Sequence, residues 1–460
     1  MICSGEFISK RSFGTILEEP TLNRKILIIS PYFPPINAPD HQRVRMGLPY
    51  FQKLGWEPLI LTVRPDCVEG TIDPLLTQTI PENTSITQIN ALPVKYTRRL
   101  GLSNIGWRCL PYLFATGQRI LSTQKIDLIY FSTTVFITMA LAPLWFRRFK
   151  IPYLLDFQDP WLNDYGKKYG YDQPPGGQFK YGFAQQVAQV LEPFTMRKVS
   201  HIISVSTAYP KTLMERYSWL KEDQFTVLPF GAPEKDFELL PQLKVKQTIF
   251  NSHDGKRHWV YVGRGGSDMA LALRGLFLGI KSERTRHPEY WNSIKLHFVG
   301  TSYAAGERAT KTVEPIAEEF GINDLVEEYP NRVPYFEALQ LLVESDGILL
   351  IGSNNPDYTA SKLYPCILAH KPILALFHQQ SSVVEILKNC QAGRIISFDS
   401  HDSPTDLLPQ VTEQLNWLIS TPKEYEPETN WLAFKPYTAQ EMTRQQCAVF
   451  DRVISNSSLS

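Results

Sequence analysis

The sequence predicts an α/β protein built from two doubly wound parallel-sheet domains. Short β-branched or leucine-rich runs alternate with helical patterns along most of the chain, and this alternation pauses only once, near the middle. No repeat of fixed period appears, which excludes solenoid architectures. At 460 residues, the chain is long enough for two domains of this kind.

The first domain is predicted to begin with a strand at 25–30, a β-branched run that precedes a proline-rich loop. A helix over 42–54 should follow, because apolar side chains recur there at helical spacing and Gly55 can end the helix. The further elements expected in this domain are strands at 58–63, 126–131, 151–156 and 201–205, and helices at 133–146 and 184–198. Strands that alternate with helices predict a parallel sheet.

The alternation pauses in the mixed segment 232–255, which contains two prolines. We place the boundary between the domains there, at 235/236. The elements expected after it are strands at 257–263, 294–300, 325–329, 347–351, 372–377 and 393–397, and helices at 269–284, 309–320 and 336–344. This order predicts a second doubly wound domain.

Composition and charge narrow the classes of partner. The chain has 47 Lys and Arg against 46 Asp and Glu, so its formal charge of +1 provides no global field for nucleic acid. The six cysteines have no paired spacing, and no Asp-x-Asp triplet or histidine cluster suggests a metal site. Residues 1–23 lack the apolar core of a signal peptide, and the longest apolar run, 133–146, is shorter than the roughly 20 residues that span a bilayer. These features predict a cytoplasmic protein.

Parallel strands present their carboxyl ends at one edge of a sheet, where open α/β sheets bind ligands. We therefore expect one cleft to be lined by the loops after Ile29, Asp156, Val262, Val299 and Ile351.

The stretch 357–377 is the clearest candidate for a ligand-binding segment. Ser361 can cap a short helix, whose free amides and positive dipole end favour an anion, and Lys362 adds a charge. Pro365 is acceptable only in the first turn of such a helix. A buried strand follows at 372–377. This pattern predicts a phosphate-binding site.

Lys362-Leu-Tyr-Pro-Cys-Ile-Leu-Ala-His-Lys-Pro-Ile-Leu-Ala375 resembles the donor-sugar motif of the family 4-like retaining glycosyltransferases. The resemblance implies a GT-B fold, in which two Rossmann-like domains face each other across a cleft. The implied organisation is a tail at 1–23, an acceptor-side domain at 24–235, a donor-binding domain at 236–435, and a last helix within 436–460 that crosses back to the first domain.

The motif also departs from the family pattern. Many members carry two glutamates separated by seven residues, one near the donor sugar and one on the ribose hydroxyls. The aligned positions here hold Asp357 and Pro365. Asp357 can still accept a hydrogen bond from a sugar hydroxyl, whereas Pro365 has neither a side-chain acceptor nor an amide hydrogen.

On the donor side, Trp259–Gly266 resembles the family's Val-Gly-Arg segment, in which the arginine holds the nucleotide diphosphate. Arg264 can make paired hydrogen bonds to phosphate oxygens, and Lys362 with Ser361 should supply the second cation. A dinucleotide fingerprint is the weaker interpretation, because Asp268 stands where its third glycine should be. The other donor-binding residues that the resemblance implies are Gly263, Gly300, Asn331, Val333, Asp357 and Leu363.

On the acceptor side, Asp156–Trp161 resembles the family's Asp-x-Arg-Asp-x-Trp segment, with Gln158 in place of arginine. Asp159 is the candidate catalytic residue, since a carboxylate after a strand can orient an acceptor hydroxyl or take its proton. An Asx turn before Pro160 is its competing role. The predicted acceptor-side residues are Asn37, Arg43, Asp156 and Trp161. Arg43 is either an anion contact or a surface arginine, and His41 is expected to be solvated.

The resemblance implies a metal-independent hexosyltransferase-type enzyme of polysaccharide biosynthesis that needs no cofactor. It would move a sugar, with retention, from a nucleotide diphosphate sugar to a hydroxyl of a glycan or lipid-linked acceptor. A degenerate GT-B protein that binds nucleotide or glycan without catalysis is the alternative, favoured by Pro365 and by Asn37-Ala38 in place of a family glycine pair. A third hypothesis, a nucleotide-sugar epimerase, lacks a clear set of acid and base residues.

Basic and bulky side chains interleave between Lys95 and Lys150. Such a mixture can contact anionic headgroups at the inner face of the membrane, and an ordinary helix surface is the alternative interpretation. The glycine- and tyrosine-rich segment 163–180 is expected to be a loop that closes over an acceptor.

Overall fold

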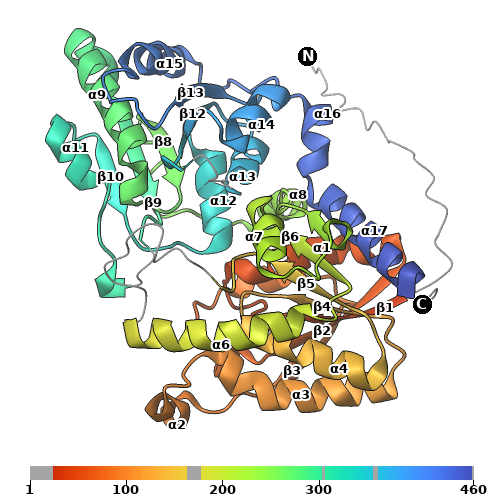
Figure 1. Cartoon of the computed structure of the whole chain (residues 1–460). Coiled ribbons are helices and arrows are strands. Elements are labelled where there is room, and N and C mark those ends of the chain that lie inside the picture. The colour runs from red at the N-terminus through yellow and green to blue at the C-terminus, as the bar shows by residue number, and fades with distance from the viewer. Residues whose placement is uncertain (1–23, 163–177, 303–305, 356–360, 458–460) are drawn as a thin grey trace, which may run out of the picture.

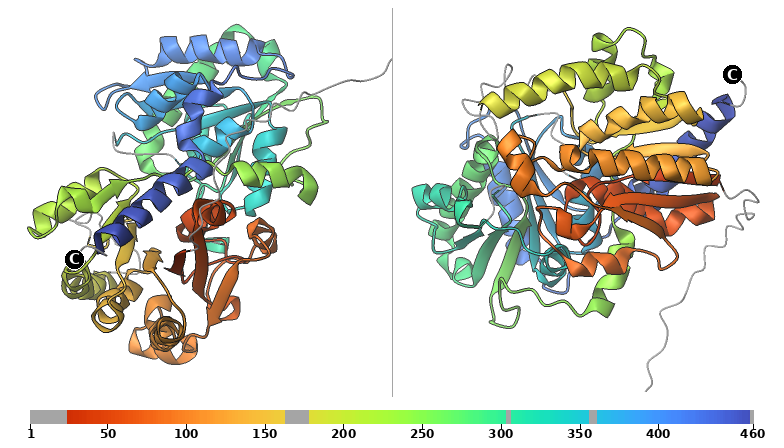
Figure 2. Two further views of the ribbon diagram at one scale, coloured as in Figure 1. Left: turned by 90° about the vertical axis from the view of Figure 1, so that its right-hand side faces the viewer. Right: turned by 90° about the horizontal axis from the view of Figure 1, so that it is seen from below.

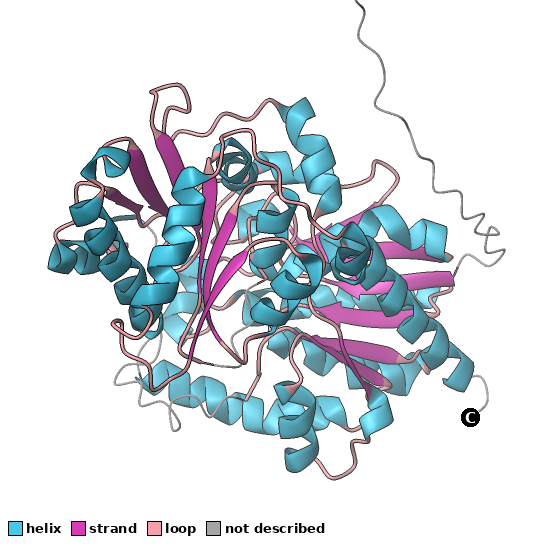
Figure 3. Cartoon of the chain, turned by 90° about the horizontal axis from the view of Figure 1, so that it is seen from above, coloured by secondary structure: helices cyan, strands magenta, loops and turns pink. Residues whose placement is uncertain are grey.

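The computed structural model describes residues 24–162, 178–302, 306–355 and 361–457. It contains two parallel sheets, each covered by helices on both faces (Figure 1). The two sheets form separate groups when the molecule is seen from above (Figure 3). The predicted tail, Asp357 and most of the predicted loop at 163–180 lie outside the described residues.

The first sheet has seven parallel strands in the order β3-β2-β1-β4-β5-β6-β7. The strands are β1 Arg24–Ile29, β2 Trp56–Val63, β3 Ser85–Ile89, β4 Leu128–Ser132, β5 Tyr153–Phe157, β6 His201–Ser204 and β7 Phe225–Val227. The predicted strands are confirmed. The edge strand β3 was not predicted, because it is largely uncovered and lacks the apolar run of a buried strand.

One face of this sheet is covered by α3 Ile105–Thr123, α4 Leu141–Phe149 and α6 Gln178–Met196, and the other face by α1 Gln42–Phe51 and α17 Ala439–Ser457. The remaining helices of the first domain and the linker are α2 Val94–Thr97, α7 Ala208–Arg216 and α8 Glu234–Leu243. The predicted helix over 133–146 is wrong in its first half. Thr133 and Thr134 hydrogen-bond to Asp40 there, and a 3₁₀ turn at Phe136–Ala140 precedes α4.

The second sheet has six parallel strands in the order β10-β9-β8-β11-β12-β13. They are β8 Arg257–Val262, β9 Ile294–Val299, β10 Val326–Tyr329, β11 Gly347–Ile351, β12 Ile373–His378 and β13 Arg394–Phe398. The helices α9 Ala270–Arg286, α11 Glu314–Phe320 and α15 Leu408–Ser420 cover one face, and α12 Tyr335–Glu344, α13 Leu363–Leu368 and α14 Ser382–Cys390 cover the other. Two short helices, α10 Pro288–Trp291 and α16 Trp431–Phe434, complete the domain.

The last described helix returns to the first domain (Figure 2). Phe450 of α17 packs among three aromatic rings of that domain, with ring centroids 6.3 Å from Phe51 and 5.3 Å from both Trp56 and Tyr130. Asp451 also pairs with Arg24 at 2.6 Å. The domain limits proposed from the sequence remain predictions.

A buried polar cluster joins the two domains on one side. Both guanidinium ends of Arg45 donate to the Asp236 carboxylate at 2.8 Å, and Tyr335 Oη donates to the same carboxylate at 2.6 Å. The Tyr335 amide donates to Asp73 Oδ2 at 2.7 Å. These four residues, the junction cluster, come from α1, α8, α12 and the loop after β2. One buried ion pair and the hydrogen bonds of Tyr335 thus connect the first domain, the linker helix and the second domain.

Candidate active site

Lys362 is the central residue of the donor side. Its ammonium lies beside Gly263 at the end of β8, so that a Cβ placed on Gly263 would be 2.1 Å from Lys362 Nζ. The Nζ atom is buried and has no hydrogen-bond partner among the described residues, and it lies 5.6 Å from the centroid of the Tyr261 ring. An ammonium held without an acceptor is costly, and an anion would remove that cost.

The electrostatic surroundings of Lys362 favour the same ligand. Burial, together with the nearby guanidinium groups of Arg264 and Arg332, lowers the pKa of Lys362 to about 7. Arg264 is held by paired hydrogen bonds to Asp268 at 2.8 and 2.6 Å. Three cationic side chains therefore converge at the carboxyl end of β8, where the charge of a diphosphate would be stabilised.

The predicted cap at Ser361 is wrong. The helix α13 begins at Leu363 with Lys362 as its N-cap residue, and Ser361 is exposed. The reason is Pro365: a helix capped at Ser361 would need an amide hydrogen at position 365 for its first bond, and proline has none. With Lys362 as the cap, the first bond runs from the Cys366 amide to the Lys362 carbonyl at 3.4 Å.

The other predicted donor-binding residues lie around this point. Gly300 follows β9 with a φ of +75°, a conformation that favours glycine. The Asn331 side chain accepts a hydrogen bond from the Gly306 amide at 2.9 Å, so it holds the neighbouring loop. Leu363 is buried in the core of the second domain and Val333 packs at its edge. These positions shape the backbone near Lys362, and their contact with a ligand stays a prediction.

On the acceptor side, Arg43 and Asp156 are both fully buried and pair with each other at 2.9 Å. Arg43 also donates to the Leu228 carbonyl at 2.6 Å, and Asp156 accepts from Ser132 and Gln158, both at 2.8 Å. The alternative of a surface arginine is therefore wrong. This pair and Gln158 hold strand ends and loops in place inside the domain.

Asp159 and Trp161 lie nearer the surface. Asp159 is an exposed residue, and partial desolvation of its carboxyl by the surrounding protein raises its pKa. Trp161 is partly buried and stacks on Phe136, with ring centroids 5.5 Å apart. The backbone of Asn37 is held in place, because its main-chain amide donates to the Thr71 carbonyl at 2.8 Å. An exposed carboxylate and an aromatic ring thus stand together after β5.

The sequence did not identify Asp40, a residue that is only 1% exposed. Burial raises its pKa to about 7, although hydrogen bonds from Thr133 and Thr134 oppose that rise. Its position in the loop after the first strand is the feature of the sequence that could have identified it as a site residue. The neighbouring His41 is also buried, with its Nε2 atom 2.8 Å from the Ile36 carbonyl, so the expectation of a solvated ring is wrong.

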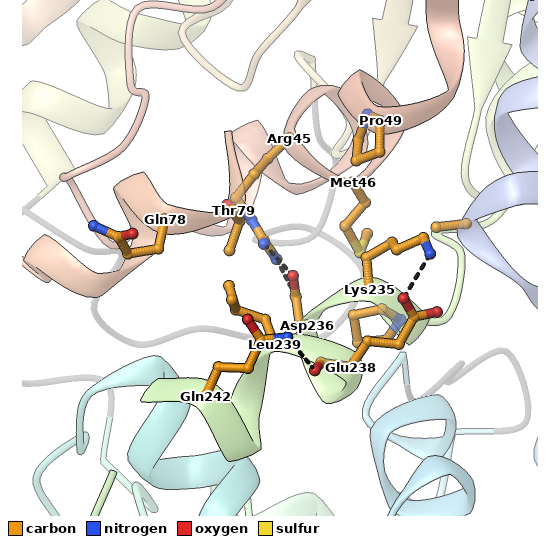
Figure 4. A pocket seen from close by; sticks show the side chains of 12 residues that line it. Arg45, Met46, Pro49, Gln78, Thr79, Lys235, Asp236, Glu238, Leu239 and Gln242 are labelled. Carbon is orange, nitrogen blue, oxygen red and sulfur yellow. Dashed lines mark hydrogen bonds and ion pairs between the residues drawn. The ribbon is translucent and has the colours of Figure 1, made fainter. Parts of the chain in front are cut away.

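A pocket of about 230 Å³ lies beside the junction cluster, between α1 and α8 (Figure 4). Its charged groups pair with one another, Arg45 with Asp236 and Lys235 with Glu238. The cations of this pocket are thus paired, whereas the Lys362 ammonium has no hydrogen-bond partner among the described residues, so the candidate donor site is the one at Lys362.

Solved structures with the same architecture define the class of fold. HepE of Anabaena, in a crystal structure with UDP, is 14% identical, with 93% of this chain and 100% of that chain covered and a TM-score of 0.53. The α,α-trehalose 6-phosphate synthase of Burkholderia multivorans is 11% identical, with 95% and 98% covered and a TM-score of 0.57. The UDP-GlcNAc 2-epimerase of Methanocaldococcus jannaschii is 12% identical, with 93% and 99% covered and a TM-score of 0.50.

The predicted fold class is confirmed: the chain has a GT-B fold. No protein-family model and no curated protein sequence matches the chain. In the part of the chain that the structure describes, no helix is long and apolar enough to cross a membrane. Within those same ranges, no group of three or more His, Cys, Asp or Glu side chains is arranged to hold a metal ion.

Proposed function

We propose that the protein is a glycosyltransferase that moves a sugar from a nucleotide diphosphate donor to a hydroxyl acceptor with retention. The observation that carries the proposal is the buried Lys362 ammonium without a hydrogen-bond acceptor, close to two guanidinium groups at a strand end. Neighbours of the same fold include a protein solved with UDP and with UDP-glucose, which supports a nucleotide-sugar donor.

In this proposal the cations of the second domain stabilise the departing diphosphate. Lys362 and Arg264 bind phosphate oxygens, and because these charges are fixed before reaction, they favour the charge that develops as the sugar leaves. A hexose donor, metal independence and the absence of a cofactor belong to the same proposal, because the cations would take the part that a metal plays elsewhere. On the other side of the cleft, Asp159 would orient the acceptor hydroxyl and Trp161 would pack against a sugar ring.

Replacing Lys362 with alanine should weaken UDP binding by roughly 10- to 100-fold, the effect of losing a hydrogen bond between charged groups. Because the pKa of the free ammonium is about 7 and a bound anion raises it, UDP affinity should fall as the pH rises above 7 in the wild type. Alanine at 362 should abolish that pH dependence. Calorimetric titration with UDP between pH 6 and pH 9 measures both effects.

Two further variants sharpen this test. Gly263→Ala places a methyl group 2.1 Å from the present Nζ position, so it should weaken UDP binding by moving the charge without removing it. Lys388→Ala removes an exposed lysine from α14 in the same domain and should leave UDP affinity unchanged. Saturable binding that survives both Lys362→Ala and Gly263→Ala would contradict the proposal.

The alternative of a binding protein without catalysis rests on Pro365, which cannot hold a ribose as glutamate does. Donor hydrolysis or sugar transfer to any acceptor would exclude it. An epimerase is the other candidate, because one neighbour of the same fold is a UDP-GlcNAc 2-epimerase. Analysis of the sugar after incubation without an acceptor separates the two enzymes, since an epimerase inverts one stereocentre of the sugar and a transferase leaves the sugar's identity unchanged, even when it hydrolyses the donor.

Peripheral contact with the inner face of the membrane is a further part of the proposal. The helices α2, α3, α4 and α6 lie along one face of the first domain (Figure 2, right). Their residues include a single carboxylate, Glu192, which is buried and bonded to Arg216. Exposed apolar side chains of these helices are Tyr96, Tyr112, Leu144, Phe183, Val190 and Phe194. Exposed basic ones are Lys95, Arg119, Arg147 and Arg148.

A face that is both basic and apolar, without exposed carboxylates on its helices, suits anionic lipid headgroups. The protein should sediment with vesicles that contain phosphatidylglycerol and much less with vesicles of phosphatidylcholine alone. Arg147→Glu with Arg148→Glu should reduce sedimentation several-fold, whereas Lys388→Glu in the second domain should not. Equal binding to both kinds of vesicle would contradict membrane contact through this face. A cytoplasmic location with a glycan or lipid-linked acceptor, as in polysaccharide biosynthesis, accords with such contact.

A further inference from the structure

The buried carboxyl of Asp40 lies where three strand-end loops of the first domain meet. Its Oδ2 atom accepts from Thr133 Oγ1 at 3.1 Å and from the Thr134 amide at 3.5 Å. Its backbone carbonyl accepts from Gln158 Nε2 at 2.9 Å. These bonds join the loops after β1, β4 and β5. Because β1 and β4 are the neighbours at which the strand order reverses, Asp40 stands at the point where open α/β sheets bind ligands.

The second oxygen of this carboxyl, Oδ1, is buried and has no hydrogen-bond partner among the described residues. The titratable groups that act on Asp40 from its surroundings are Asp159, after β5, and Tyr32, in the same loop as Asp40. The Arg43 and Asp156 charges lie beyond Gln158 and compensate each other. His41 is turned to the Ile36 carbonyl. An ionised Asp40 therefore leaves Oδ1 in need of a donor, and a substrate hydroxyl is such a donor.

Building on the proposed glycosyl transfer, we propose that Asp40 Oδ1 takes the proton of the acceptor hydroxyl, which enters beside Asp159 and Trp161. As the acceptor oxygen bonds to the anomeric carbon, the bond from that carbon to the diphosphate breaks and its electron pair leaves with the phosphate. The hydroxyl proton moves to Asp40, which releases it to water after the product departs. Asp159 then acts as a positioning residue whose charge raises the proton affinity of Asp40.

The proton affinity of Asp40 suits this role. Burial and the Asp159 charge raise the pKa of Asp40 to about 7, and a general base works best when its pKa lies near the working pH. The ratio kcat/KM, which reports the pKa of the free enzyme, should therefore rise with pH through about 7 and level off above it. A leaving phosphate that took the proton by itself would leave the rate independent of Asp40.

The test compares Asp40→Asn with the wild type, with UDP-glucose as donor and water or an added glycan as acceptor. The variant keeps an acceptor for Thr133 but cannot take a proton, so its kcat should fall by roughly 100- to 10,000-fold and the rise near pH 7 should disappear. The increase in melting temperature that UDP produces should be unchanged, because the donor cations lie in the other domain. Asp66→Asn, which removes an exposed carboxylate of the first domain, should leave kcat and its pH profile as in the wild type.

A stability measurement accompanies the kinetics. The pKa of Asp40 is raised in the folded chain, so the folded state binds the proton more tightly and loses stability as the pH rises from about 4 to about 7. Asp40→Asn removes that loss. The variant should melt at a higher temperature than the wild type at pH 8 and at the same temperature at pH 4.

The outcomes separate this inference from the proposed function. A wild-type pH profile and kcat in Asp40→Asn would overturn the role of Asp40, and so would loss of the UDP-induced melting shift in that variant. A wild type that binds UDP but neither hydrolyses nor transfers the sugar would also overturn it. Failure of the wild type to bind any nucleotide diphosphate would overturn the proposed function itself.

Discussion

Asp236→Ala is expected to lower the free energy of unfolding by about 3–5 kcal/mol, the usual cost of removing one partner of a buried ion pair. Asp236 accepts from both guanidinium ends of Arg45 and from the Tyr335 hydroxyl, and the Arg45 side chain is fully buried. Without the carboxylate, the Arg45 charge retains the Gln42 side chain as its one acceptor within the described part of the chain. Urea unfolding followed by circular dichroism measures the loss.

Lys235→Ala is the control for this prediction. Lys235 is the neighbouring residue on α8, and its ion pair with Glu238 is exposed, so its removal should cost less than about 1 kcal/mol. A loss for Asp236→Ala no larger than that of the control would refute the view that the junction cluster stabilises the fold.

Arg43→Met is expected to lower the free energy of unfolding by a similar amount, about 3–5 kcal/mol at pH 8. It leaves the Asp156 charge in the core with Ser132 and Gln158 as its remaining donors among the described residues. The loss should be smaller at pH 5. An unpaired buried carboxylate has a pKa above its unfolded value, so the folded variant takes up a proton as the pH falls and regains stability. Urea unfolding at both pH values tests whether the loss of stability is smaller at pH 5 than at pH 8.

A second substitution tests whether the unpaired Asp156 charge causes the loss of stability. Asp156→Asn added to Arg43→Met removes the stranded charge and should recover part of the lost stability at pH 8. Arg64→Met, which breaks an exposed pair with Asp66, should change stability by less than about 1 kcal/mol at either pH. Equal losses at both pH values, without recovery in the double variant, would mean that packing rather than charge holds Arg43.

The sequence predicted the strands that form the centre of each sheet, because a parallel strand covered on both faces must be almost wholly apolar. It did not predict β3, whose Ser, Thr and Gln side chains are tolerated at an open edge. It also extended the helix at 309–320 too far, since α11 begins at Glu314, directly before Pro315. Proline is favoured in the first turn of a helix, so that residue was a usable signal.

The site could be predicted only in part, because it is formed by contacts between residues that lie far apart in the sequence. Lys362 was identified from its own motif. Its position beside Gly263, however, results from the packing of elements that lie about 100 residues apart in the chain. Arg43 and Asp156 were assigned separately to the acceptor side, and nothing in either local pattern reveals that they neutralise each other. Asp40 was missed because its burial is produced by loops that follow two other strands.

The return of α17 to the first domain bears on how the chain folds during synthesis. The rings of Phe51, Trp56 and Tyr130 leave the ribosome early, but the Phe450 ring that packs among them is made more than 300 residues later. The second domain can complete its core before that moment, because its six strands lie within 257–398. The domain that is translated first therefore finishes folding last, and until then an aromatic surface on it is open to chaperones.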